Sequence, residues 1–256
     1  MTAQAPIEAV VTSLRIVESL AEADGPLGVS EIASLIGSTK PRVFRHLRTL
    51  LERHYVIQDP ATDKYLLTLR LFHLAQSIPE KTGFLREARR ILPALRDEVR
   101  QSVAVGVIEE HGVRVVEILR HLSAIQITTT PGTLFGFAES AQGKIALAFG
   151  PATLRNSVLR AHGRTAGRSA AAALKKELEE IRVLGWAVAP EAVLVGVNAV
   201  AVPVVDAHGE LVGTIALVGS VQYLSRRPDA DLIKVLQGAA QQISHRLGFN
   251  GVTVQT

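Results

Sequence analysis

The stretch KPRVFRHLRTLLERH at residues 40–54 decides the expected fold of the first part of the chain. Its apolar residues recur at helical spacing, and they form one expected buried stripe of Val43, Leu47, Leu50 and Leu51. Thr39 is a plausible N-cap, and Pro41 is tolerated because it falls in the first turn of the helix. The stretch therefore predicts an amphipathic helix over about residues 40–53.

The same stretch concentrates positive charge. It holds five cationic side chains against the single carboxylate of Glu52: Lys40, Arg42, Arg45, Arg48 and Arg53. A basic cluster on one element is typical of a surface that binds phosphates. Charge alone still favours the ordinary alternative, which is a solvated helix face.

The flanking sequence completes a small domain. Helical spacing predicts one helix at residues 6–23 and a second at residues 30–36, with Ser30 as its N-cap candidate. Residues 55–57 and 65–67 flank a polar turn and predict a hairpin. Three helices followed by a hairpin indicate a winged helix-turn-helix, in which the third helix is narrow enough to enter the major groove of DNA.

The rest of the chain alternates strands with helices. Residues 68–78 continue helically, residues 79–83 are typical of a hinge, and Pro93 is expected to kink or split a helix over residues 84–102. Further helices are expected at about residues 140–149, 151–161, 169–184 and 229–247. Extended segments are expected at residues 103–108, 113–119, 125–130, 193–205 and 211–218. Their hairpin connections predict an antiparallel sheet with helices packed on it, which is an α+β fold.

Composition excludes several classes of protein. The chain has 256 residues, 47% of them apolar, and no cysteine, so disulfides, thiolate metal sites and cysteine nucleophiles are absent. The eight histidines form no His-Glu-x-x-His pair, and no Gly-x-Ser-x-Gly elbow occurs. We therefore expect no enzyme activity, no metal and no cofactor. The sequence has no long apolar run, and its start lacks the basic region followed by an apolar region that is typical of a signal peptide. We therefore also expect a cytoplasmic protein without membrane contact.

At this point the sequence resembles the IclR family of bacterial transcription regulators. The motifs that carry the resemblance lie at residues 13–18 (SLRIVE), 29–33 (VSEIA), 40–50, 64–67 (KYLL), 140–148 (SAQGKIALA), 181–187 (IRVLGWA) and 196–204 (GVNAVAVPV). Each motif is weak alone, but their order and spacing are specific. The resemblance implies a DNA-binding domain at residues 1–67, a linker helix and hinge at residues 68–83, and a GAF-like domain for effector binding and oligomerisation at residues 84–256. It also implies dimers, often paired into tetramers, on palindromic operators of double-stranded DNA near catabolic genes, and it favours repression.

The resemblance and the charge pattern together predict the residues that contact DNA. We expect Arg42, Arg45 and His46 to enter the groove, where arginine reads guanine bidentately. Phosphate contacts are expected from Thr39, Lys40 and the wing residue Lys64. Ser30 and Val43 complete the expected DNA-binding set. Relatives usually carry Lys-Ser-Thr where this chain has Lys40-Pro41-Arg42, so the operator sequence of relatives does not transfer.

The resemblance also places an effector pocket on the concave face of the sheet. The expected lining is Ile125, Ile127, Leu134, Phe135, Ser140, Ala141, Gln142, Val197, Ala199, Ala216 and Val218. Ala189, Ala216 and Val218 stand where relatives that bind small keto acids carry carboxyl and hydroxyl groups. The loss of those groups and the flat wall of Phe135 favour an apolar or aromatic effector. A carboxylate is compatible with it, held by backbone N–H groups around residues 140–142. Ser140 itself is expected to cap its helix first.

Two other functions fit parts of the pattern. One is a protein-interaction module whose winged helix binds another protein, although the row of arginines argues against it. The other is a small-molecule-binding protein that does not bind DNA. A steep decrease of binding with salt would favour DNA as the partner.

Overall fold

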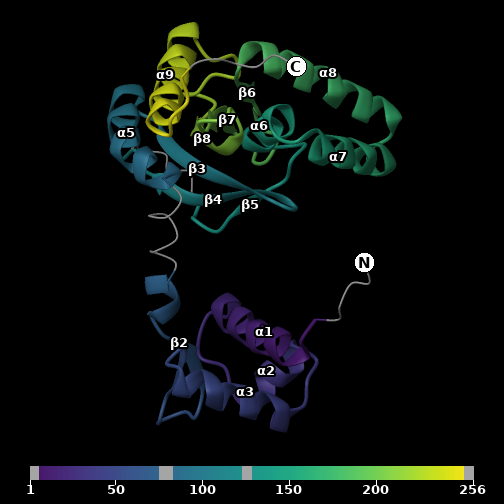
Figure 1. Ribbon diagram of the computed structural model, residues 1–256, viewed down its shortest axis with the longest axis vertical. Coiled ribbons are helices and arrows are strands. Elements are labelled where there is room, and N and C mark those ends of the chain that lie inside the picture. The colour runs from purple at the N-terminus through teal and green to yellow at the C-terminus, as the bar shows by residue number, and fades with distance from the viewer. Residues whose placement is uncertain (1–5, 75–82, 123–128, 251–256) are drawn as a thin grey trace. The chain divides into compact units, whose positions relative to one another are not determined.

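The computed structural model describes residues 6–74, 83–122 and 129–250. The chain divides into two compact units, Met1–Lys81 and Thr82–Thr256, which are coloured purple to blue and blue to yellow in Figure 1. Each unit has its own apolar core, so each is described by itself.

The first unit is a winged helix-turn-helix, as expected. It contains helices α1 (Glu8–Glu22), α2 (Val29–Leu35) and α3 (Lys40–Glu52), followed by strands β1 (Val56–Gln58) and β2 (Tyr65–Leu67), which pair antiparallel. The predicted stripe of α3 packs into the core, with Val43, Leu47 and Leu50 buried and Leu51 half-buried. Helical backbone starts again at residue 70 and is described as far as residue 74, while residues 79–82 of the predicted hinge lie outside the described residues.

The start of α2 differs from the prediction. The N-cap is Gly28 rather than Ser30, and the helix begins at Val29. The Glu31 carboxylate accepts a hydrogen bond of 2.6 Å from the Gly28 backbone N–H. This contact satisfies a free donor at the helix start, so a side-chain cap from Ser30 is not needed.

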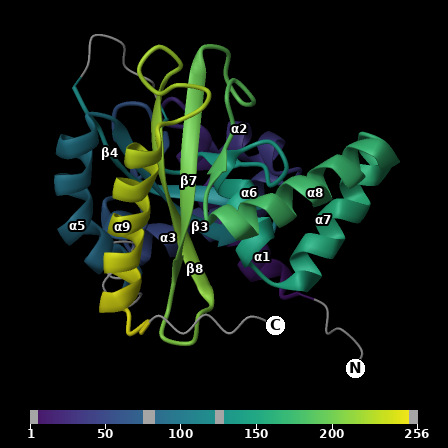
Figure 2. The ribbon, with the colours of Figure 1, turned by 90° about the horizontal axis from the view of Figure 1, so that it is seen from above.

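The second unit is built on a six-stranded antiparallel sheet with strand order β5-β4-β3-β8-β7-β6. The strands are β3 (Ser102–Glu109), β4 (Gly112–Leu119), β5 (Leu134–Phe135), β6 (Ala187–Val188), β7 (Val197–Val205) and β8 (Leu211–Ser220). Helices α5 (Phe84–Val99) and α9 (Ala230–Arg246) cover one face, and α6 (Ala141–Phe149) and α8 (Arg168–Leu184) lie on the other, as Figure 2 shows. Helix α7 (Ala152–Thr165) packs beside α8.

Three details depart from the sequence-based expectations. Strand β7 starts at Val197 rather than at residue 193, because Gly196 adopts a left-handed φ of 80° that ends the extended run. The short strands β5 and β6 were not predicted. Pro93, which was expected to kink or split its helix, lies inside the single helix α5. The expected extended segment at residues 125–130 falls mainly outside the described residues.

The two faces of the sheet carry side chains of different size. Branched side chains such as Val200, Val202 and Ile215 pack against α5 and α9. Ala201 and Ala216, which pair across β7 and β8, face α6 and α8 instead. Since successive residues of a strand point to opposite faces, this alternation is set by the sequence. Small side chains on the α6 face leave room above the sheet, and this is where the cavity described below lies.

Candidate nucleic-acid interface and ligand pocket

Helix α3 presents a basic, solvent-exposed stripe. Its exposed residues recur every three or four positions and are Pro41, Phe44, Arg45, Arg48, Thr49 and Glu52. Lys40 is also exposed at the start of the helix. Residues at this spacing share one helix face, so Arg45 and Arg48 project on the same side. Arg48 contacts Glu52 at 3.3 Å, whereas Arg45 has no side-chain ion pair within the part of the chain that the structure describes.

Arg42 and His46 lie on a different flank, against α1. The Arg42 guanidinium donates a hydrogen bond of 2.9 Å to Thr12 Oγ1, and it lies 3.6 Å from the Glu8 carboxylate. His46 Nδ1 lies 2.8 Å from Ser13 Oγ. Burial lowers the pKa of His46, and the nearby charges of Arg42 and Arg45 lower it further. At neutral pH the imidazole is therefore predominantly neutral, and both side chains join α3 to α1.

The other predicted DNA contacts fall in three kinds of environment. Val43 is fully buried in the core of the unit, which corrects its assignment to a DNA-contacting surface. Its place in the buried stripe was already clear from the helical spacing. Ser30 and Thr39 are exposed. In the wing, the Lys64 ammonium lies 3.3 Å from the Glu31 carboxylate of α2. The hydrogen bond from the Gly28 backbone N–H lowers the pKa of Glu31, and the contact with Lys64 lowers it further.

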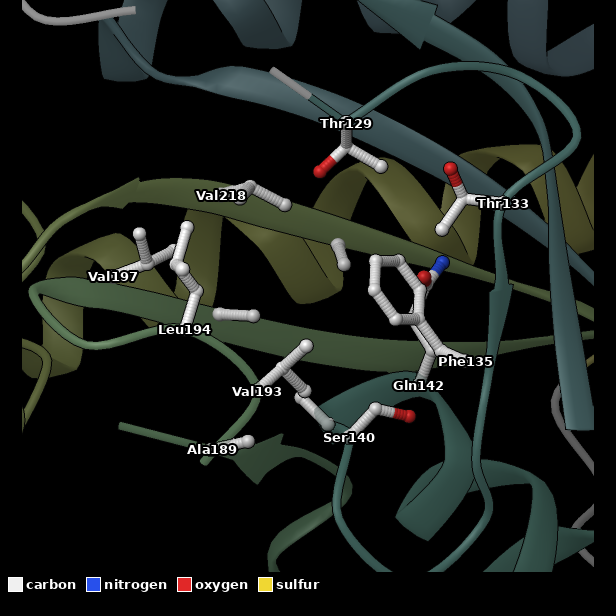
Figure 3. A pocket seen from close by; sticks show the side chains of 13 residues that line it. Thr129, Thr133, Phe135, Ser140, Gln142, Ala189, Val193, Leu194, Val197 and Val218 are labelled. Carbon is white, nitrogen blue, oxygen red and sulfur yellow. The ribbon is translucent and has the colours of Figure 1, made fainter. Parts of the chain in front are cut away.

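The second unit contains an apolar cavity of about 270 Å³ on the α6 face of the sheet (Figure 3). Eight of the predicted effector-binding residues line it: Phe135, Ser140, Ala141, Gln142, Val197, Ala199, Ala216 and Val218. Leu134 does not line it, because it is the neighbour of Phe135 in strand β5 and points to the opposite side. Ile125 and Ile127 lie outside the described residues.

The remaining lining residues were not chosen from the sequence as ligand contacts. Thr129 and Thr133 border the cavity from the segment before β5, while Val193 and Leu194 border it from the connection between β6 and β7 (Figure 3). Ala189 also lines the cavity, and it is one of the positions where relatives that bind small keto acids carry carboxyl or hydroxyl groups. The sequence predicted residues 193–195 as part of a strand rather than as a connection, because a short apolar run is also typical of a buried strand.

The cavity residue Gln142 belongs to a buried polar pair. The Gln142 side-chain amide donates a hydrogen bond of 3.1 Å to Thr214 Oγ1 in β8, and both residues are buried. Gly106 of β3 pairs directly with Thr214 across the sheet. A Cβ atom at Gly106 would lie 2.6 Å from Gln142 Nε2 and 2.7 Å from Thr214 Oγ1, so the pair requires glycine there.

Ser140 caps helix α6, as expected. Its hydroxyl accepts a hydrogen bond of 3.0 Å from the Gly143 backbone N–H and donates one of 2.7 Å to the Gly136 carbonyl. Lys144 N–H is satisfied by the Ser140 carbonyl at 2.9 Å. The first-turn N–H groups of Ala141 and Gln142 have no partner within the helix itself, and both residues line the cavity.

The described residues hold no group of three or more His, Cys, Asp or Glu side chains arranged to bind a metal ion. Within those residues, no helix has the length and apolar character that crossing a bilayer requires.

Comparison with known proteins identifies the family. A profile for the IclR helix-turn-helix domain matches residues 9–60, and a profile for the C-terminal domain of the bacterial transcriptional regulator IclR matches residues 77–245. The chain belongs to the IclR family. It is 28% identical over 248 residues to the glycerol operon regulatory protein of Streptomyces griseus, which covers 94% of this chain and 97% of that protein. It is 23% identical to the transcriptional regulator KdgR of Escherichia coli, over 95% and 94% of the two chains.

Solved structures show the same fold. A putative transcriptional regulator from a Rhodococcus species superposes with a TM-score of 0.80 at 22% identity, covering 94% of this chain and 98% of that one. An IclR homologue from Microbacterium hydrocarbonoxydans, complexed with 4-hydroxybenzoate, gives 0.77 at 20% identity, over 93% and 98% of the chains. This IclR-family chain is therefore a DNA-binding transcription regulator with a ligand-binding C-terminal domain, and its family consists of regulators rather than enzymes.

Proposed function

We propose that this IclR-family regulator represses a catabolic operon and responds to a small aromatic or apolar carboxylic acid. The observation that carries the proposal is the lining of the cavity. Its walls are mainly apolar, with Phe135 as a flat side and no charged side chain among the described lining residues. A mainly apolar site favours a ligand with a large apolar body over glyoxylate or pyruvate, because only the larger ligand has apolar surface to bury against these walls.

The carboxylate of such a ligand would bind at the start of α6. The N–H groups of Ala141 and Gln142 belong to the first turn, where the helix dipole favours negative charge. Thr129 and Thr133 offer hydroxyl groups on another side of the cavity. An aromatic acid with a polar substituent therefore matches the distribution of polar atoms. The homologue complexed with 4-hydroxybenzoate supports this ligand class.

DNA binding is assigned to α3 and the wing in a homodimer or a tetramer built from dimers. Arg45 is exposed and suits a groove or phosphate contact. Lys40, Thr39, Ser30 and Lys64 suit phosphate contacts. Lys64 would exchange its Glu31 partner for a phosphate. Arg42 and His46 are proposed to contact base edges near the α1 flank, which requires Arg42 to release Thr12. A palindromic operator then needs the two copies of α3 about 34–36 Å apart, or at a multiple of that spacing.

The response to ligand follows from that spacing. A ligand that binds better to one arrangement of the dimer shifts the population toward it, with a typical coupling of about 1–3 kcal/mol. The hinge at residues 79–83 would carry the change. Ligand binding is then expected to weaken operator binding by roughly 5- to 150-fold.

The ligand class is tested by calorimetry on the full chain. Benzoate, 4-hydroxybenzoate and longer aromatic acids are compared with pyruvate and glyoxylate. We expect at least one aromatic acid to bind more tightly than both keto acids. Tighter binding of pyruvate than of every aromatic acid would refute the proposed ligand class.

The DNA-binding role is tested by selecting bound sequences from a random duplex library and measuring binding at several salt concentrations. We expect a palindromic consensus and a steep decrease of affinity with salt. Arg42→Ala should relax sequence preference more than Lys40→Ala does, and Arg53→Ala at the end of α3 is the matched control. Equal losses on selected and random DNA for both variants would refute this division of roles. Expression from the neighbouring promoter should rise when the gene is deleted, whereas a decrease would indicate activation.

A further inference from the structure

The connection between β6 and β7 covers part of the ligand cavity without being buried itself. We call residues 190–196 the strap. Val193 and Leu194 line the cavity, yet each is more than half exposed, and Val195 is 84% exposed. No residue of the strap is buried. Burial in the core therefore contributes little to holding these side chains over the cavity, so the polar contacts of the strap carry more weight.

Backbone hydrogen bonds fix the ends of the strap. Ala189 N–H donates to the Ala199 carbonyl at 3.0 Å, and Glu191 N–H donates to the Val197 carbonyl at 2.7 Å, which extends the pairing of β6 with β7. Val197 N–H donates to the Leu194 carbonyl at 3.1 Å. These bonds close the base of a hairpin-like turn. They do not involve Val193, so other contacts must keep Val193 in place over the cavity.

The Glu191 carboxylate supplies those contacts. Its Oε1 accepts a hydrogen bond of 2.9 Å from the Gly196 N–H, which ties the two ends of the strap together. Its Oε2 contacts the guanidinium of Arg226, in the segment that follows β8. Glu191 has a left-handed backbone with a φ of 56°, which is unfavourable for a residue other than glycine. Its two carboxylate contacts offset that cost.

The segment that carries Arg226 is itself anchored to the sheet. The side-chain amide of Asn198, fully buried in β7, donates to the Leu224 carbonyl at 3.3 Å and to the Ser225 carbonyl at 2.7 Å. Leu224 is fully buried as well. The Gly196 carbonyl accepts a hydrogen bond of 2.9 Å from Val221 N–H in the same segment. The backbone beside Arg226 is thus anchored to the sheet, and the Arg226 side chain reaches from it to the strap.

We propose that Glu191 and Arg226 are positioning residues that hold the strap closed over the cavity, so that breaking their contact opens the route by which ligand enters and leaves. The proposal rests on the ligand-binding function proposed above. It assigns to Val193 and Leu194 the role of a movable wall, while Phe135 and the sheet residues form the fixed walls.

Hydrogen exchange followed by mass spectrometry on the full chain tests the closure without any ligand. Arg226→Gln and Glu191→Gln remove the charge pair, and Gln at position 191 keeps an acceptor for Gly196 N–H. Both should speed exchange of residues 191–197 by up to about fivefold, the upper end of the range expected for a partly exposed ion pair. Glu191→Ala, which also removes the acceptor, should speed it further. Arg227→Gln is the matched control at the adjacent position and should exchange like the wild type.

If the strap of Arg226→Gln exchanged hydrogen at the wild-type rate, or if Arg227→Gln accelerated exchange equally, the proposal that Glu191 and Arg226 hold the strap closed would be overturned. The second measurement is the dissociation rate constant of 4-hydroxybenzoate, which should rise in Arg226→Gln by about the same factor as exchange and stay unchanged in Arg227→Gln. An unchanged rate constant in Arg226→Gln overturns the gating role. If no aromatic acid binds but the exchange pattern is as expected, the proposed ligand class fails and the closure by Glu191 and Arg226 stands.

Discussion

Gln142 and Thr214 are joined by a buried hydrogen bond of 3.1 Å beneath the ligand cavity, although they lie 72 positions apart in the chain. The bond links the first turn of α6 to the middle of β8, so it sets the distance between the helix start and the sheet. Gly106 lies opposite Thr214 and leaves room for the Gln142 amide. The placement of Gln142, which lines the cavity, thus depends on a position that bears no side chain.

Gly106→Ala should therefore destabilise the protein. The added Cβ would lie 2.5 Å from Val113 Cγ1 in addition to its contacts with the polar pair, and overpacking of this kind costs about 1–3 kcal/mol. Denaturant unfolding measures the change. Gly238→Ala is the matched control: nothing lies within 4 Å of its added Cβ, and alanine inside helix α9 should stabilise by up to about 1 kcal/mol. Equal effects of the two substitutions would contradict this account of Gly106.

Phe135 and Leu134 are neighbours in β5 with opposite expected effects on ligand binding. Phe135→Ala removes the aromatic wall and should raise the Kd for an aromatic acid about tenfold or more, which corresponds to about 1.4 kcal/mol. Leu134→Ala should change that Kd less than twofold, because Leu134 faces away from the cavity. Calorimetry measures both constants. A larger loss in Leu134→Ala would place the ligand elsewhere.

Ser140→Ala should separate capping from ligand contact. Loss of the hydroxyl leaves Gly143 N–H without its acceptor at the start of α6 and should cost about 1 kcal/mol of unfolding free energy. Ser140→Thr keeps a hydroxyl and should retain most of the stability. If capping is the main role, the Kd for 4-hydroxybenzoate changes only slightly in both variants. A large rise in Kd with unchanged stability would instead assign Ser140 to the ligand.

The lowered pKa of His46 predicts how stability depends on pH. Burial and the charges of Arg42 and Arg45 depress the folded-state pKa below the unfolded value of 6.5. Between the two pKa values the unfolded chain binds more protons, so stability is full above pH 6.5 and falls as pH decreases through that window. His46→Gln should flatten this dependence between pH 7.5 and 5, as measured by denaturant midpoints. An identical pH slope in the variant would show that His46 does not contribute.

The sequence predicted more of the pocket than of the DNA-binding face. The family resemblance named Val197, Ala199, Ala216 and Val218 as lining residues, and the period-two alternation of two paired antiparallel strands explains why all four lie on one side of the sheet. On α3 the helical period separated the buried stripe from the rest of the surface. It did not show which of the remaining residues contact another helix. Arg42 and His46 form their hydrogen bonds with Thr12 and Ser13 of α1. The spacing of residues within α3 cannot predict these contacts, because they depend on how the two helices pack.

The sequence by itself determined most of the helices, the longer strands and the basic character of α3, because helical and strand periods are local properties of neighbouring residues. Only the tertiary structure decided that residues 193–196 lie outside the strand expected at residues 193–205, and that Val193 and Leu194 line the cavity. This difference arises from a left-handed Gly196 and from contacts of Glu191 with a segment 35 positions further along. Interactions between residues so distant in the chain depend on how the sheet and helices pack, and no local pattern records them.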